Sequence, residues 1–237
     1  MTFDNFCAGN TYKYAFSTAK SVADSPDGTY NPLIFYGPSG VGKTHLLSAI
    51  ETHLKDTYKK LLIISVSAEE LMNDLREFII KNDIVSFRQK YDNADVLLID
   101  NFELVAEKTT TQEELFLIFD RYIRNNKQIV LCITETEDNA FSEKIKSRLS
   151  SGVALEMKFP DDKIKKDIID ATANELNIKL DENEIDYILE KASTVGKIKG
   201  LLKTLTIFCK EDKHPSFELV KKVCKNKELL KTPFSPG

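Results

Sequence analysis

The chain has 237 residues, of which 42% are hydrophobic and 30% charged, and its formal net charge is −4. This composition is typical of a globular protein and excludes an intrinsically disordered chain. The acidic balance disfavours a protein that binds duplex DNA mainly through a basic face, because neutralised phosphates supply most of the non-specific affinity.

The cysteines and the first residues indicate the cellular setting. Four cysteines lie far apart without a C-x-x-C pair, and only three histidines are present, so we expect free thiols and no metal-ligand cluster. The chain starts without the basic and apolar regions of a signal peptide, and no apolar run approaches the roughly 18 to 20 residues of a membrane span. We expect a cytoplasmic protein with no membrane partner.

Four short apolar runs predict buried strands of a parallel sheet, because they are continuous rather than alternating. They span residues 33–36, 61–66, 96–99 and 128–133. Amphipathic stretches between them predict helices over residues 44–56, 68–81 and 112–125. Strands that alternate with helices in this way predict an α/β, doubly wound parallel sheet.

Beyond residue 160 only helical patterns remain. Asp161 is the predicted N-cap of a helix that ends near residue 176, and Asp181 with Glu184 predicts a capping box for a helix that ends near residue 192. Two more helical stretches span residues 197–210 and 217–227. We therefore predict an α/β nucleotide-binding core over residues 1–160, a small all-helical domain over 161–227 and a disordered tail over 228–237.

Residues 37–44, GPSGVGKT, match the phosphate-binding motif G-x-x-x-x-G-K-[ST] at every fixed position. The motif lies between a predicted strand and a predicted helix, which disfavours a chance glycine-rich turn. Glycines let backbone N–H groups turn toward phosphates, and the N-terminus of the helix adds a favourable dipole. The predicted phosphate-binding residues are Ser39, Gly40, Val41, Gly42, Lys43, Thr44 and His45.

A second nucleotide motif supports the first. Residues 96–100, VLLID, form an apolar strand that ends in a carboxylate, as expected beside a P-loop. Lys43 is predicted to reach the β- and γ-phosphates, while Thr44 and Asp100 are the predicted Mg²⁺ ligands, Asp100 through a bound water. We therefore expect ATP with Mg²⁺.

Several longer stretches resemble the AAA+ ATPase core of the bacterial chromosomal replication initiator DnaA family over residues 2–227. They are TFDNF at 2–6, YNPL at 30–33, GKTHLL at 42–47, DVLLID at 95–100, TQEELF at 111–116, NKQIV at 126–130 and KSRL at 146–149. The resemblance implies a P-loop NTPase with an AAA+ doubly wound sheet and a small helical lid. It also implies a nucleotide switch in the initiation of DNA replication or in its regulation.

The resemblance assigns further roles position by position. Phe6, Ala8 and Gly9 correspond to the segment that lines the adenine pocket, and Thr134 stands at the first sensor site. Arg148 matches the arginine finger that contacts the γ-phosphate of a neighbouring subunit, which implies self-assembly or an AAA+ protein partner. An ordinary surface arginine is the alternative for Arg148.

The departures from the family pattern fall mainly on hydrolysis. Asn101 replaces the second carboxylate after the strand, and an amide can hold a water but cannot accept its proton. Glu103 either substitutes for that carboxylate or points elsewhere. Thr134 replaces an acidic sensor residue, and Gly196 replaces the arginine expected in the lid. We therefore expect ATP to be bound well and hydrolysed slowly or not at all.

Contacts with DNA are also reduced. The duplex-reading helix-turn-helix domain of the initiators has no counterpart in these residues, so we expect no sequence-specific duplex binding. The sequence is either a trimmed part of an initiator or a short natural relative, and the divergent catalytic residues favour the relative. Residues 71–87 match the element through which the family contacts single-stranded DNA, a ligand for which Arg76, Arg88 and Lys108 offer phosphate contacts. A solvated helix of mixed charge explains these residues equally well.

Two other functions compete with the nucleotide switch. A replication regulatory adaptor or helicase loader would work through protein contacts, and its assembly would not respond to the nucleotide. A P-loop kinase of small metabolites would need a site for a substrate hydroxyl and a catalytic base, and the sequence contains no pattern for either.

Overall fold

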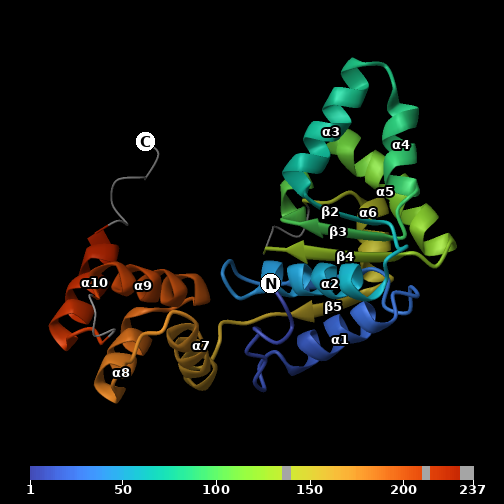
Figure 1. The fold of residues 1–237 in the computed structure, drawn as a ribbon. Helices are drawn as coiled ribbons and strands as arrows, with labels where there is room; N and C mark the ends of the chain where they lie inside the picture. The colour runs from blue at the N-terminus through green and yellow to red at the C-terminus, as the bar shows by residue number, and fades with distance from the viewer. Residues whose placement is uncertain (135–139, 210–213, 230–237) are drawn as a thin grey trace. The chain divides into compact units, whose positions relative to one another are not determined.

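The computed structural model describes residues 1–134, 140–209 and 214–229. The chain forms two compact units (Figure 1). The first comprises Met1–Phe6 and Tyr12–Lys158, and the second comprises Cys7–Thr11 and Phe159–Gly237. The sequence did not indicate that residues 7–11 belong with the helical unit. Of the tail predicted over 228–237, residues 230–237 lie outside the described part.

A five-stranded sheet forms the centre of the first unit, in the order β2-β3-β4-β1-β5, and every neighbouring pair is parallel. The strands are β1 (Leu33–Tyr36), β2 (Ile63–Ser67), β3 (Val96–Asp100), β4 (Gln128–Ile133) and β5 (Val153–Glu156). This confirms the predicted α/β class. Strand β5 was not predicted, because it has only four residues and every second one is exposed, so it lacks the continuous apolar run of a buried strand.

The strand register brings several predicted site residues to one edge of the sheet. Tyr36 at the end of β1 pairs with Ile133 at the end of β4. On the other side of β4, Ile99 of β3 pairs with Leu131. Asp100 therefore lies at the same edge as the end of β4 and the loop that follows β1, where α/β proteins bind their ligands.

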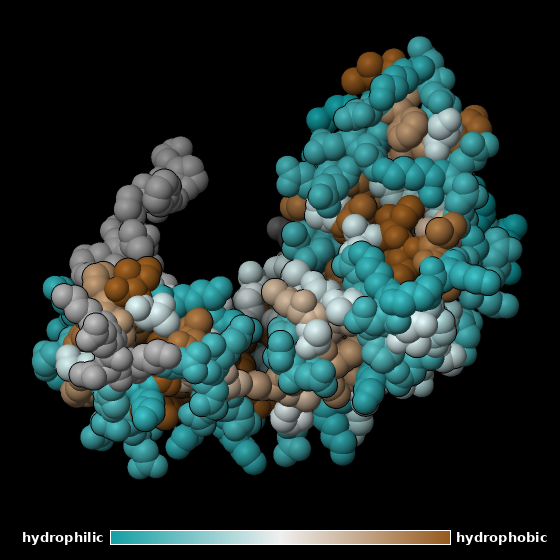
Figure 2. Space-filling model, in the orientation of Figure 1, coloured by the Kyte–Doolittle hydropathy of each residue, from teal (hydrophilic) through white to brown (hydrophobic). Residues whose placement is uncertain are grey.

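Six α-helices and one 3-10 turn of the described chain surround this sheet. They are α1 (Lys13–Asp24), α2 (Lys43–Thr57), α3 (Ala68–Ile80), α4 (Ile84–Asp92), η1 (Phe102–Val105), α5 (Thr109–Arg124) and α6 (Glu143–Ser150). Helix α3 begins with a capping box in which the backbone N–H of Ser67 donates to Glu70 at 2.7 Å. Figure 1 shows α3 and α4 as a pair that projects beyond the sheet. Ile80 is 73% exposed at the end of α3, and apolar surface is visible at the tip of this pair (Figure 2).

The second unit contains α7 (Asp162–Glu175), α8 (Glu182–Lys191), α9 (Val195–Phe208) and α10 (Phe217–Leu229). The Asp161 carboxylate accepts a hydrogen bond from the Ile164 amide at 2.8 Å, which confirms the predicted N-cap. The capping box of Asp181 and Glu184 is also confirmed. Within the described residues no helix is long and apolar enough to cross a lipid bilayer.

Candidate functional site

The loop between β1 and α2 has the backbone conformation of a phosphate cradle. Gly37, Gly40 and Gly42 have φ angles of 144°, 82° and 109°, a region in which only glycine is unstrained. Such turns allow successive N–H groups to line one concavity, at the N-terminus of a helix whose dipole favours anions. Among the predicted loop residues, Ser39 and Gly40 are exposed and Val41 is buried.

Gly37 also lies close to a neighbouring strand end. A Cβ atom at this position would lie 2.1 Å from the carbonyl oxygen of Met157, a separation that no side chain tolerates. We expect Gly37→Ala to lower the free energy of unfolding by at least about 2 kcal/mol, because the backbone strain adds to the overlap. Urea denaturation of the whole chain measures this loss.

Gly196 provides the matched control, because a Cβ there meets no atom within 4 Å and its φ is ordinary. Gly196→Ala, inside α9, should leave stability unchanged or raise it by up to about 1 kcal/mol. Equal urea midpoints for Gly37→Ala and the parent chain would show that the loop does not need glycine.

Lys43 is the first residue of α2, and only 7% of its surface is exposed. Its Nζ donates to the carbonyl oxygens of Gly37 at 2.6 Å and Pro38 at 2.8 Å, so the ammonium group lies against the loop itself. Thr44 follows it and is exposed. The structure thus places the cation and the hydroxyl of the motif at the N-terminus of one helix.

The segment predicted to line an adenine pocket is divided between the two units. Phe6 belongs to the first unit, where its ring lies 5.2 Å from the ring of His45 and stacks on Phe16 at 5.8 Å. Ala8 and Gly9 belong to the second unit, in which Gly9 has a φ of 45° and approaches Ile164. Their common role in a pocket therefore stays a prediction.

Asp100 lies beside a buried cysteine, Cys132, which the sequence did not indicate as a site residue. Burial raises the pKa of the Cys132 thiol well above its ordinary value. The charge of Asp100 raises it further, and the ammonium group of Lys43 lowers it. Both predicted ligand-binding residues are therefore within electrostatic reach of one thiol at the end of β4. No signal distinguished Cys132, because a cysteine in an apolar run is usually part of the core.

Glu103 returns to the sheet edge after β3. Asn101 has a φ of 52°, is exposed and donates its backbone N–H to Asp100 at 2.9 Å. The chain then forms η1, from which the Glu103 carboxylate accepts a hydrogen bond from the Thr134 backbone N–H at 2.9 Å. Of the two possibilities that the sequence left open, the structure therefore favours a Glu103 side chain directed toward the sensor position.

Arg148 lies on α6 and is held by α5. Its Nη2 lies 2.7 Å from one oxygen of Asp120, whose other oxygen lies 2.7 Å from Nη2 of Arg124. The guanidinium group also covers the ring of Phe116 at 5.2 Å, and 30% of the side chain is exposed. Arg148 is therefore fixed within its own chain rather than extended into solvent, which its Lys-Ser-Arg context did not predict.

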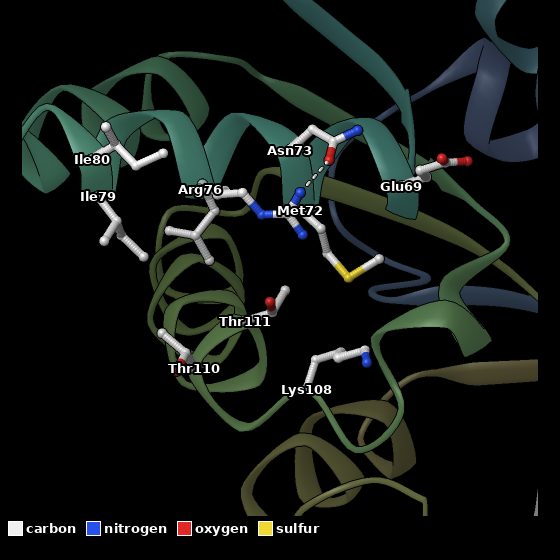
Figure 3. Close-up of a pocket in the computed structure, with 10 residues that line it drawn as sticks. Glu69, Met72, Asn73, Arg76, Ile79, Ile80, Lys108, Thr110 and Thr111 are labelled. Carbon is white, nitrogen blue, oxygen red and sulfur yellow. Dashed lines mark hydrogen bonds between the residues drawn. The ribbon is translucent and has the colours of Figure 1, made fainter.

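A cavity of about 530 Å³ lies between α3 and the start of α5 (Figure 3). Arg76, Asn73 and Lys108 contribute polar groups to its lining, and Met72 and Ile79 contribute apolar surface. Arg88, which was predicted with Arg76 and Lys108 as a phosphate contact, instead forms a bidentate ion pair with Glu114, with both N–O distances 2.7 Å. Arg76 and Lys108 therefore line the same cavity, whereas Arg88 is paired with Glu114 on α5.

A family model described as the bacterial DnaA ATPase domain matches residues 1–156, which is more than half of the chain. The chain belongs to this family. The chromosomal replication initiator protein DnaA of Bdellovibrio bacteriovorus is 32% identical over 98% of this chain and 50% of that protein. The DnaA of Rickettsia canadensis is 34% identical over 85% of this chain and 45% of that protein. The chain thus spans about half the length of these curated DnaA relatives.

Solved DnaA structures have the same fold. Domain III of the Thermotoga maritima replication initiation protein DnaA superposes with a TM-score of 0.87, at 30% identity over 95% of both chains. A replication initiator DnaA bound to AMPPCP and single-stranded DNA gives a TM-score of 0.85, at 30% identity over 97% of this chain and 70% of that one. The Thermotoga maritima RuvB motor, at 20% identity and a TM-score of 0.66, supports the AAA+ fold alone.

Proposed function

We propose that this chain binds ATP with Mg²⁺ and acts as a nucleotide switch in the initiation of DNA replication or in its regulation. The observation on which this depends is the loop built from Gly37, Gly40 and Gly42, which opens α2 with Lys43 enclosed in it. Two DnaA relatives of 29% and 30% identity were solved with AMPPCP, an ATP analogue, which supports the same ligand here.

The residues of the proposed site have separate tasks. Lys43 binds the β- and γ-phosphates, and the positive-φ glycines allow main-chain N–H groups to surround them. The Thr44 hydroxyl and the Asp100 carboxylate offer the hard oxygen ligands that Mg²⁺ requires, so the residues present fit that ion. When bound, the ion neutralises charge on the phosphates. Phe6, from the first unit, is the proposed neighbour of the adenine.

Hydrolysis is proposed to be slow. Asn101, which follows Asp100, offers an exposed amide that cannot accept a proton from an attacking water. Slow hydrolysis suits a switch, because the ATP-bound conformation then persists long enough for assembly. Light scattering of the protein in ATP·Mg²⁺ and in ADP tests this function, and equal masses in both nucleotides would argue for a regulatory adaptor instead.

We also propose that the cavity between α3 and α5 binds single-stranded DNA, a ligand with which one DnaA relative was solved. In the lining of this cavity, Arg76 and Lys108 provide two cations for phosphate groups, and the side chains of Thr110 and Thr111 provide hydroxyl groups. Apolar surface from Met72 suits contact with bases, because every base presents an apolar face.

Replacing both Arg76 and Lys108 by Ala should weaken binding of a fluorescent oligothymidine at least about tenfold. It should also lower the slope of log affinity against log salt by about 1.4, since each phosphate contact contributes about 0.7 on single strands. Fluorescence anisotropy measures both quantities. Lys20→Ala, at an exposed position of α1, is the control and should change neither. An unchanged salt slope in the double variant would exclude this surface.

A further inference from the structure

The segment after β3 is rigidly anchored. Phe102 and Val105, both in η1, are completely buried. The ring of Phe102 stacks on Phe119 at 5.8 Å and on Phe141 at 5.5 Å. These contacts hold the backbone on both sides of Phe102. Asn101, which precedes it, is therefore exposed, and Glu103, which follows it, points toward the end of β4.

Glu103 connects the segment after β3 to the end of β4. Its Oε2 accepts a hydrogen bond from the Thr134 N–H at 2.9 Å. Thr134 follows Ile133, which pairs with Tyr36, the last residue before the glycine loop. The Gly37 N–H donates to the Ile133 carbonyl at 3.2 Å, so the loop and Glu103 bind the two sides of one peptide group, the carbonyl of Ile133 and the N–H of Thr134. The charge of Glu103 also contributes to the raised pKa of Cys132, together with that of Asp100.

We propose that Glu103 is the catalytic carboxylate for ATP hydrolysis in this chain, in place of the residue at position 101. This inference rests on the proposed binding of ATP at residues 37–44. One carboxylate oxygen is held by the Thr134 amide, and among the described residues Oε1 has no hydrogen-bond partner. Oε1 is therefore available to a water molecule at the edge of the sheet that also carries the proposed phosphate loop.

In the reaction the water oxygen forms a bond to the γ-phosphorus while the bond from that phosphorus to the β,γ-bridging oxygen breaks. The electron pair of the broken bond stays on ADP, and the proton of the water passes to Oε1 of Glu103 and then to solvent. The products are ADP and inorganic phosphate. Lys43, which lies against the loop carbonyls, is the proposed cation beside the β- and γ-phosphates.

Glu103→Gln in the full chain tests the proposal, because the glutamine oxygen still accepts the Thr134 N–H while the charge is removed. We expect single-turnover phosphate release to fall at least about tenfold, and up to about 100-fold or more, as for the loss of a general base. ATP affinity should stay within about twofold, since only the chemical step is affected. After incubation and gel filtration, the variant should retain ATP where the parent retains ADP.

Two companion variants make the result specific. Glu113→Gln, an exposed acid on α5, should leave phosphate release unchanged, and Asn101→Asp should raise it by supplying a second carboxylate. An undiminished rate in Glu103→Gln overturns the proposal. So does a lower rate with a parallel loss of ATP affinity or of melting temperature, because Glu103 would then only support the strand end. Absence of ATP binding in the parent chain would instead refute the proposed function.

Discussion

Lys43→Ala should lower the affinity for ATP·Mg²⁺ at least about 100-fold, which corresponds to about 2.7 kcal/mol. The Lys43 ammonium group is nearly buried and lies inside the loop, with carbonyl oxygens at 2.6 and 2.8 Å. Removal of a buried, hydrogen-bonded charge from a charged complex typically costs about 2 to 5 kcal/mol, far more than removal of an exposed one. Isothermal titration calorimetry with ATP in the presence of Mg²⁺ gives the two affinities directly.

The matched control for this experiment lies on the same helix. Lys55, in the last turn of α2, is exposed and pairs with Glu51, so Lys55→Ala removes an equal charge far from the loop. Its ATP affinity should equal that of the parent chain. A melting curve of Lys43→Ala is also required, because the variant loses two hydrogen bonds within the loop. Equal affinities for Lys43→Ala and the parent would refute the proposed ATP site.

Much of the fold was predictable because its signals are local. Continuous apolar runs indicated β1, β3 and β4, whose residues are almost all buried. Side-chain chemistry at helix starts indicated the caps at Asp161 and Asp181. The edge strand β5 was missed because half of its residues are exposed, so that periodicity and length both become weak signals.

The parts of the site that were missed depend on contacts between distant residues. The left-handed conformation of Asn101 is followed by the turn that brings Glu103 to Thr134. Asparagine adopts a positive φ more readily than most residues, but the residue type alone does not decide that it does so at position 101. Asp120 and Arg148 meet across 28 positions of the chain, on two helices whose packing the sequence pattern does not define. A motif therefore predicts a phosphate-binding loop, but the tertiary fold decides how carboxylates such as Glu103 and arginines such as Arg148 are held.

Arg148→Ala should abolish ATP-dependent assembly, with the mass in ATP·Mg²⁺ reduced to the mass in ADP. The physical reason is that a guanidinium group offers bidentate, charge-assisted hydrogen bonds to a phosphate of a neighbouring subunit, which alanine cannot replace. Within the chain, one Asp120 oxygen and the Phe116 ring hold the group by single contacts. Arg148 Nε is buried, so the donors left for an incoming phosphate are those of the two terminal nitrogens that Asp120 does not use. Size-exclusion chromatography with light scattering measures the assembly.

Arg124 is the control that separates assembly from stability. It shares the Asp120 carboxylate with Arg148, but 76% of its side chain is exposed, so Arg124→Ala should cost at most about 1 kcal/mol and leave assembly intact. Arg148→Ala also leaves Asp120 paired, with Arg124, and should therefore fold normally. If the mass of Arg148→Ala in ATP·Mg²⁺ still exceeds its mass in ADP, the ion pair between Arg148 and Asp120 only stabilises the packing of α6 on α5. A regulatory adaptor that works through other protein contacts would then explain the chain better than a self-assembling switch.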